Sequence, residues 1–235
     1  MCTVSFVVSN KKIIITSNRD EKVIRPAIEP KNYLINNKKI SFPKDPKAGG
    51  TWYAIDENAN VLVLLNGAEE KHIVKSPYRK SRGLIVLDII SNNSSILAWN
   101  EIDLINIEPF TLVLFYNQEL YQLRWNGINK ETTHLNNSKN YIWSSATLYD
   151  KENRANRSTW FYNYLDTKQS VNEVEMLDFH RYTEKNNSEN GLVINRNETM
   201  KTLSITQTVI EKNKVVMIYS DLINQNEFAN TFLIT

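Results

Sequence analysis

The chain contains a single cysteine, Cys2, which directly follows Met1. Methionine aminopeptidases remove an initial methionine when the next side chain is small, so we expect a mature chain that begins with a cysteine bearing a free α-amine. An α-amino group titrates near ~7.7–8.0 and a thiol near ~8.5, so the amine can accept the thiol proton around neutral pH. Nucleophile and general base would then belong to one residue. The sequence therefore predicts a reactive thiol at Cys2.

A predicted β-hairpin determines which residues lie beside Cys2. Apolar and β-branched residues recur with period two over residues 3–8 and 12–17, which is typical of two paired strands. Asn10-Lys11 can form the turn, because asparagine tolerates the left-handed backbone region better than most residues. A two-residue turn at these positions pairs residues whose numbers sum to 21, which places Arg19 opposite Cys2.

Arg19 and Asp20 could tune this thiol. Arg19 is a permanent cation, and beside a thiolate it would lower the pKa of the thiol. Asp20 could hold either the α-amine or the arginine. Two simpler interpretations stay open at this point: Cys2 is an incidental residue, or the charged cluster is an exposed surface ion pair, which is common and weak.

Several motifs of the chain resemble one family. Met1-Cys2-Thr3 and the segment 17–21, Ser-Asn-Arg-Asp-Glu, resemble the NRDE family, also called the transport-and-Golgi-organization-2 family. Further matches in the family's order are Gly49-Gly50-Thr51-Trp52, Leu65-Asn66 and Arg82-Gly83-Leu84. This combination is much more specific than any one of its motifs.

The resemblance implies a fold and a class of chemistry. The expected fold is α+β, the four-layer αββα sandwich of N-terminal-nucleophile (Ntn) hydrolases, in a single NRDE-like domain over residues 1–235. The nearest chemistry is that of cysteine acylases such as penicillin V acylase and bile-salt hydrolase. Gly49, Gly50 and Trp52 are expected to shape the fold and the core.

The resemblance also assigns roles to residues. Cys2 would be the nucleophile, with Arg19 and Asp20 as the pair that tunes and orients it. Asn66 is a candidate oxyanion donor, although Asn66-Gly67 at a strand end is also a common turn signal. The remaining residues expected to organise the site are Asn18, Glu21 and Ser145.

The second half departs from the family pattern. Ser144-Ser145 stands where members often carry Ser-Asn, so a second asparagine donor is missing. Acylase relatives place an arginine on a late strand, where this chain offers Lys201 or the row Ser204, Thr206 and Thr208. Catalytic competence therefore depends on residues that the pattern does not identify.

The remaining patterns predict strands and helices in alternating groups, which suits a layered α+β domain. We predict strands over residues 51–56, 60–66, 111–116, 119–125, 141–147, 202–211 and 214–220. Helical spacing predicts one or two helices over 84–97, and single helices over 150–165 and 171–182. Segments 22–47 and 71–80 are expected to be polar loops that determine substrate choice.

Composition excludes several other classes. A net charge of +2 without a Lys/Arg run argues against nucleic-acid binding. Apolar runs fall short of the ~20 residues needed for a transmembrane segment, and no secretory signal is readable, so a cytoplasmic location is expected. One cysteine excludes a disulfide framework and a cysteine-rich zinc site. We assign no metal and no cofactor, and the oligomeric state is not indicated.

Three functional hypotheses follow. The first is an N-terminal cysteine amidohydrolase whose small-molecule substrate is a small or acylated amide. The alternative is a non-catalytic carrier of an apolar ligand such as haem, a lipid or acyl-coenzyme A. Its pocket could be lined by Trp52, Tyr53, Trp143, Trp160 and Phe161, although for each of these aromatic residues a place in the core is the favoured explanation. A purely structural or interaction role is the third, and it would tolerate a retained Met1.

Overall fold

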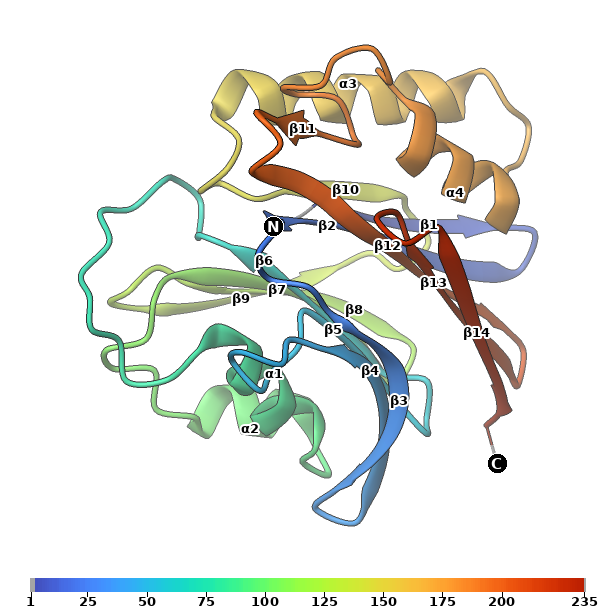
Figure 1. Cartoon of the computed structure of the whole chain (residues 1–235). Coiled ribbons are helices and arrows are strands. Elements are labelled where there is room, and N and C mark those ends of the chain that lie inside the picture. Colours follow the sequence, from blue (N-terminus) through green and yellow to red (C-terminus); the bar gives the residue numbers. More distant parts are fainter. Residues whose placement is uncertain (1–2, 235) are drawn as a thin grey trace. The chain divides into compact units, whose positions relative to one another are not determined.

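The computed structural model describes residues 3–234 (Figure 1). The chain divides into two compact units. The first combines the N-terminal segment up to Arg25 with the segment from Ser138 onward, and the second is Pro26–Asn137. The single domain over residues 1–235 stays a prediction.

The first unit contains a seven-stranded antiparallel sheet. Its strands follow the order β10-β1-β2-β12-β13-β14, and β11 also pairs with β12, so strands from both ends of the chain lie side by side. Their bounds are β1 Thr3–Ser9, β2 Lys12–Lys22, β10 Tyr141–Ser144, β11 Asn195–Arg196, β12 Met200–Glu211, β13 Lys214–Asp221 and β14 Asn226–Leu233.

Two helices cover one face of this sheet, which we call the helix face (Figure 1). Helix α3 (Lys151–Asp166) begins after the N-cap Asp150, and α4 (Glu173–Tyr182) begins with a capping box. Apolar side chains from both helices and from the sheet form one buried cluster: Val7, Ile14, Phe161, Val171, Met176, Phe179, Leu192 and Val209. The helices are thereby fixed against the strands that carry the candidate site.

The second unit contains another seven-stranded antiparallel sheet, in which β3 to β9 follow one another in chain order. Two helices, α1 (Arg82–Ile90) and α2 (Ser95–Glu101), belong to this unit, and α1 contacts β5 and β6. The strands are β3 Ile28–Ile35, β4 Lys38–Lys44, β5 Tyr53–Asp56, β6 Val61–Asn66, β7 Phe110–Tyr116, β8 Glu119–Trp125 and β9 Lys130–Leu135.

The predicted strands and helices are present, and the region 84–97 forms two helices. The prediction of a loop over 22–47 is wrong, because β2 continues to Lys22 and β3 and β4 form a hairpin. Strands β9 and β14 were also not predicted. Segment 71–80 contains no helix or strand, as predicted. Among residues 3–234, no helix is long and apolar enough to span a bilayer.

Candidate functional site

The hairpin β1–β2 has the predicted register. Asn10 and Lys11 both have left-handed backbone angles, with φ of 51° and 63°, as a tight two-residue hairpin turn requires. Every pair from Thr3 with Asn18 to Ser9 with Lys12 has numbers that sum to 21. The predicted register is therefore confirmed over these pairs. Cys2, the predicted nucleophile, lies outside the described residues.

The four residues Asn18, Arg19, Asp20 and Glu21 are all buried on β2. Side chains alternate along a strand, so they divide between the two faces of the sheet. Asn18 and Asp20 lie on the helix face. Arg19 and Glu21 lie on the other face, where both contact Arg25: the Arg19 guanidinium donates to its carbonyl at 2.9 Å, and the Glu21 carboxylate lies 3.3 Å from its guanidinium.

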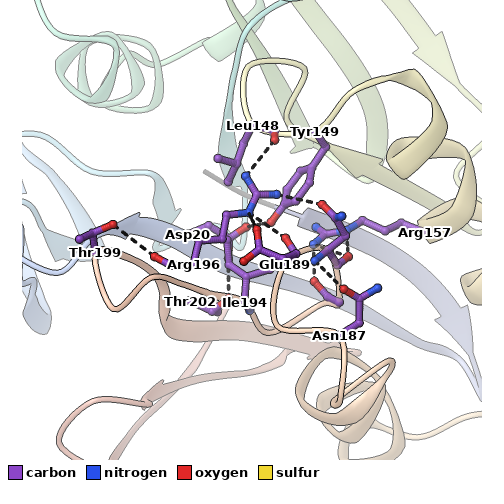
Figure 2. Close-up of polar contacts among 12 residues, drawn as sticks. Asp20, Leu148, Tyr149, Arg157, Asn187, Glu189, Ile194, Arg196, Thr199 and Thr202 are labelled. Carbon is purple, nitrogen blue, oxygen red and sulfur yellow. Dashed lines mark hydrogen bonds and ion pairs between the residues drawn. The ribbon is translucent and has the colours of Figure 1, made fainter.

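Asp20 is held by two hydroxyl groups on the helix face (Figure 2). Tyr149 donates to Oδ2 at 2.7 Å and Thr202 donates to Oδ1 at 2.6 Å. Burial, followed by the charge of Asp20, raises the pKa of Tyr149 well above its usual value, so the phenol stays protonated and acts as the donor. The sequence offered two partners for Asp20, the α-amine of Cys2 and Arg19. Since Arg19 lies on the opposite face, only the α-amine stays a predicted partner.

Two arginines hold the ring of Tyr149 (Figure 2). The guanidinium carbon of Arg157 lies 3.5 Å from the ring centroid and that of Arg196 lies 5.4 Å away. Arg157 is fully buried on α3 and donates to the hydroxyl of Thr3 and to the carbonyl of Gly191. A cation stacked on an aromatic ring stabilises its position. The sequence prediction missed Tyr149 and Arg157.

Asn18 connects β2 to α4 through a fully buried network. Its amide nitrogen donates to the carbonyls of His180 and Leu192, at 3.0 and 2.7 Å, so its oxygen faces His180 Nδ1 at 2.5 Å. Nδ1 must then carry the proton, and Nε2 accepts from the Ser5 hydroxyl at 2.7 Å. Burial, with a smaller contribution from the charge of Arg157, lowers the pKa of His180 to about 3. His180 therefore holds β1, β2 and α4 together.

A β-bulge lies beside the Asn18–Glu21 segment, where the register of β12 shifts between Thr202 and Ser204. The shift lets Thr202 face Asp20 while Ser204 stands opposite Arg19. Of the two late-strand alternatives, Ser204 is therefore the neighbour of Arg19, whereas Lys201 pairs with Glu198. Thr206 and Thr208 follow Ser204 on the same face, opposite Ser17 and Ile15.

Ser145 is fully buried directly after β10, and its hydroxyl lies 3.0 Å from that of Thr147. Its backbone carbonyl accepts from the Tyr149 N–H at 3.0 Å. Ser145 therefore helps to position Tyr149, which in turn contacts Asp20.

Asn66 belongs to the second unit and ends strand β6 opposite Phe110. Gly67 follows it with φ of +85° and donates its N–H to the Pro109 carbonyl at 3.0 Å. The turn interpretation of Asn66-Gly67 therefore agrees with the backbone. An oxyanion role for Asn66 stays a prediction.

The other two family motifs of the second unit contact each other. The Thr51 N–H donates to the Gly83 carbonyl at 3.1 Å. A Cβ on Gly50 would lie 2.3 Å from the Gly83 carbonyl carbon, so neither position has room for a side chain. Trp52 is buried in the core. The expectation that this segment shapes the fold is confirmed.

Within residues 3–234, no group of three or more His, Cys, Asp or Glu side chains could hold a metal ion. The polar groups that contact Asp20 are the hydroxyls of Tyr149 and Thr202, and the two arginines contact the Tyr149 ring. This arrangement suits the orientation of a carboxylate.

Solved structures with this fold are Ntn-type hydrolases. An N-acylethanolamine-hydrolyzing acid amidase orthologue from Caenorhabditis elegans matches with a TM-score of 0.61 and 12% identity, covering 89% of this chain and 92% of that one. Two variants of conjugated bile acid hydrolase from Clostridium perfringens match with TM-scores of 0.63 at 10% and 9% identity. They cover 98% and 100% of this chain, and 92% and 97% of their own. At this identity the likeness shows the fold, and it confirms the α+β sandwich of the Ntn hydrolase type.

The sequence model of the Transport and Golgi organisation 2 family matches residues 1–223. The chain belongs to this family, and the resemblance drawn from its first residues is confirmed. A search of curated protein sequences gave no match.

Proposed function

We propose that the chain is an N-terminal cysteine amidohydrolase that acts on a small or acylated amide after removal of Met1. The hairpin register supports this proposal, because the expected pairing of Cys2 with Arg19 follows the same sum of 21 as the pairs from Thr3 with Asn18 to Ser9 with Lys12. An acid amidase and a conjugated bile acid hydrolase among the solved structures with this fold support a carbon–nitrogen bond as the target.

The proposed reaction needs one thiol and one amine. The Cys2 thiolate attacks the amide carbonyl carbon, so a carbon–sulfur bond forms and negative charge moves to the oxygen. Arg19 stabilises the thiolate. As the carbon–nitrogen bond breaks, the α-ammonium of Cys2 gives its proton to the leaving nitrogen. Water then hydrolyses the thioester, which releases the acid and restores the thiol.

A thiol-directed acylating probe tests this proposal cleanly, because Cys2 is the only cysteine of the chain. We expect the purified protein to have the mass of the chain without Met1 and to become acylated at neutral pH, whereas Cys2→Ser reacts more slowly. Arg19→Gln should slow the acylation, because a neutral side chain no longer stabilises the thiolate. Equal reactivity of wild type and Cys2→Ser, or a mass that includes Met1, would contradict the proposal.

The carrier alternative predicts a pocket lined by aromatic side chains. Trp52, Tyr53 and Phe161 are instead fully packed within the cores of their units, which favours a structural role for them. A direct comparison is haem titration of the wild type and of Cys2→Ala. Stoichiometric binding that is unchanged in Cys2→Ala would favour the carrier over the hydrolase.

A further inference from the structure

Both oxygens of the Asp20 carboxyl group are hydrogen-bonded by side chains. Tyr149 donates to one oxygen at 2.7 Å and Thr202 to the other at 2.6 Å, and all three residues are buried. Each carboxylate oxygen can accept a second hydrogen bond, so the group can still accept from a further donor. Its orientation is fixed while it remains able to bind another group.

The donors are themselves held in place. Tyr149 is fixed by the stacked guanidinium of Arg157 and by its backbone bond to Ser145. Thr202 is fixed because its hydroxyl also accepts the Ile194 N–H at 2.9 Å. A core that served packing alone could replace such a buried polar network by apolar side chains at little cost or with a gain in stability. Its presence around one carboxylate therefore points to a use for that carboxylate.

We propose that Tyr149 and Thr202 are positioning residues, which hold the Asp20 carboxyl group in the orientation in which it can orient the α-amine of Cys2. This inference rests on the proposed function, since it gives Asp20 its partner. The role is specific to the two hydroxyl groups.

The test measures the rate of alkylation of Cys2 by iodoacetamide against pH, over the range in which each protein stays folded. Tyr149→Phe keeps the ring between the arginines and removes only the hydroxyl. A carboxyl group that loses a donor is held less firmly and orients the α-amine less well. The amine is then a poorer base for the thiol, so the acid limb of the profile should move up by about one pH unit. Thr202→Val should produce a similar shift, and Thr202→Ser, which keeps the hydroxyl, should restore the wild-type profile.

Tyr162→Phe is the matched control. Tyr162 lies on the same helix as Arg157, and its hydroxyl makes a 3.3 Å bond to a surface carbonyl, so its loss should leave the profile unchanged. Thermal unfolding of each variant separates a loss of folding from a shift of the profile.

The outcomes separate the two proposals. An acid limb that moves in Tyr149→Phe and Thr202→Val, but stays in place in Thr202→Ser and Tyr162→Phe, supports the positioning role. If none of the variants moves the acid limb of the wild type, the positioning role is overturned, and the proposal that Cys2 is the nucleophile stands. A wild-type acid limb that lies at the ~8.5 of a free cysteine thiol overturns the proposed function together with this inference.

Discussion

Acid should destabilise the first unit through His180, and the structure permits an estimate of the size of this effect. His180 is fully buried, neutral, and hydrogen-bonded through both ring nitrogens, to Ser5 and Asn18. Burial lowers its pKa in the folded protein to about 3, from the usual 6.5 of histidine. The unfolded chain therefore binds a proton at a pH where the folded chain does not, so stability is lost as the pH falls below 6.5 toward 3.

The magnitude follows from linkage. Each pKa unit corresponds to about 1.4 kcal/mol. At a pH two units below the unfolded pKa, the proton that only the unfolded chain binds therefore lowers the free energy of unfolding by about 3 kcal/mol. The reduction is complete near the folded pKa, and the effect is absent above neutral pH. For a domain of ordinary stability this is a large fraction of the total.

His180→Gln isolates this contribution, because glutamine can still accept the Ser5 hydrogen bond but does not titrate in this range. At about pH 7.5 we expect the variant to be less stable by roughly 1–3 kcal/mol, since the Asn18 oxygen loses its donor. At about pH 4.5 this difference should vanish or reverse. Urea denaturation at both pH values measures it, and His134→Gln, at an exposed ion pair with Glu119, is the control.

The difference between wild type and variant is the informative quantity, because other titrating groups contribute equally to both. If His180→Gln is less stable than the wild type by the same amount at both pH values, the burial argument for His180 is refuted. A comparable pH dependence in His134→Gln would show that an exposed histidine, and not the network on α4, is responsible.

Three substitutions test the packing that supports the site, each by the free energy of unfolding in urea. Gly83→Ala should cost roughly 1–3 kcal/mol, because its Cβ would lie 2.9 Å from a backbone oxygen; an unchanged midpoint would contradict this close approach. Phe161→Ala should lower the free energy of unfolding by about 3–5 kcal/mol, because it removes a fully buried ring. Tyr162→Ala, at the exposed position next to it, should cost about 1 kcal/mol or less, and equal costs would disprove the assignment of Phe161 to the core. Lys38 Nζ lies 2.7 Å from the buried Asp56 carboxylate. Lys38→Met should lower the free energy of unfolding by roughly 3–5 kcal/mol, because it leaves this carboxylate buried without its cation. An unchanged free energy would show that water reaches the pair.

The parts of the fold that the sequence predicted are those with a buried face and a local turn. The hairpin β1–β2 combines period-two apolar residues with Asn10-Lys11, and these features determine both its existence and its register. The hairpin β3–β4 has an equivalent turn, since Asn36 and Asn37 have φ of 52° and 62°. No residue of its strand β3 is fully buried, however, so the apolar alternation that would have identified it is absent.

The same reasoning explains which site residues were missed. Tyr149 and Thr202 are 129 and 182 positions from Asp20 in the sequence, and only the pairing of β2 with β12 and the packing of α3 bring them together. Arg157 carried a weak signal, because a charged residue occupies a position on the buried side of an amphipathic helix. Without the partner that it contacts, that position could not be assigned a role.

The alternation of β2 gives the Asn18–Glu21 segment two different tasks. Asn18 and Asp20 lie on the helix face, where one anchors α4 and the other is held by hydroxyls from β12 and from the turn before α3. Arg19 and Glu21 lie on the opposite face and share Arg25 as a partner. Under the proposed pairing with Arg19, Cys2 would share the face of Arg19, and the carboxyl group proposed to orient its amine would come from the other face of the same strand. A shift of one residue would exchange these faces, which gives a physical reason for the order of the four polar residues on β2.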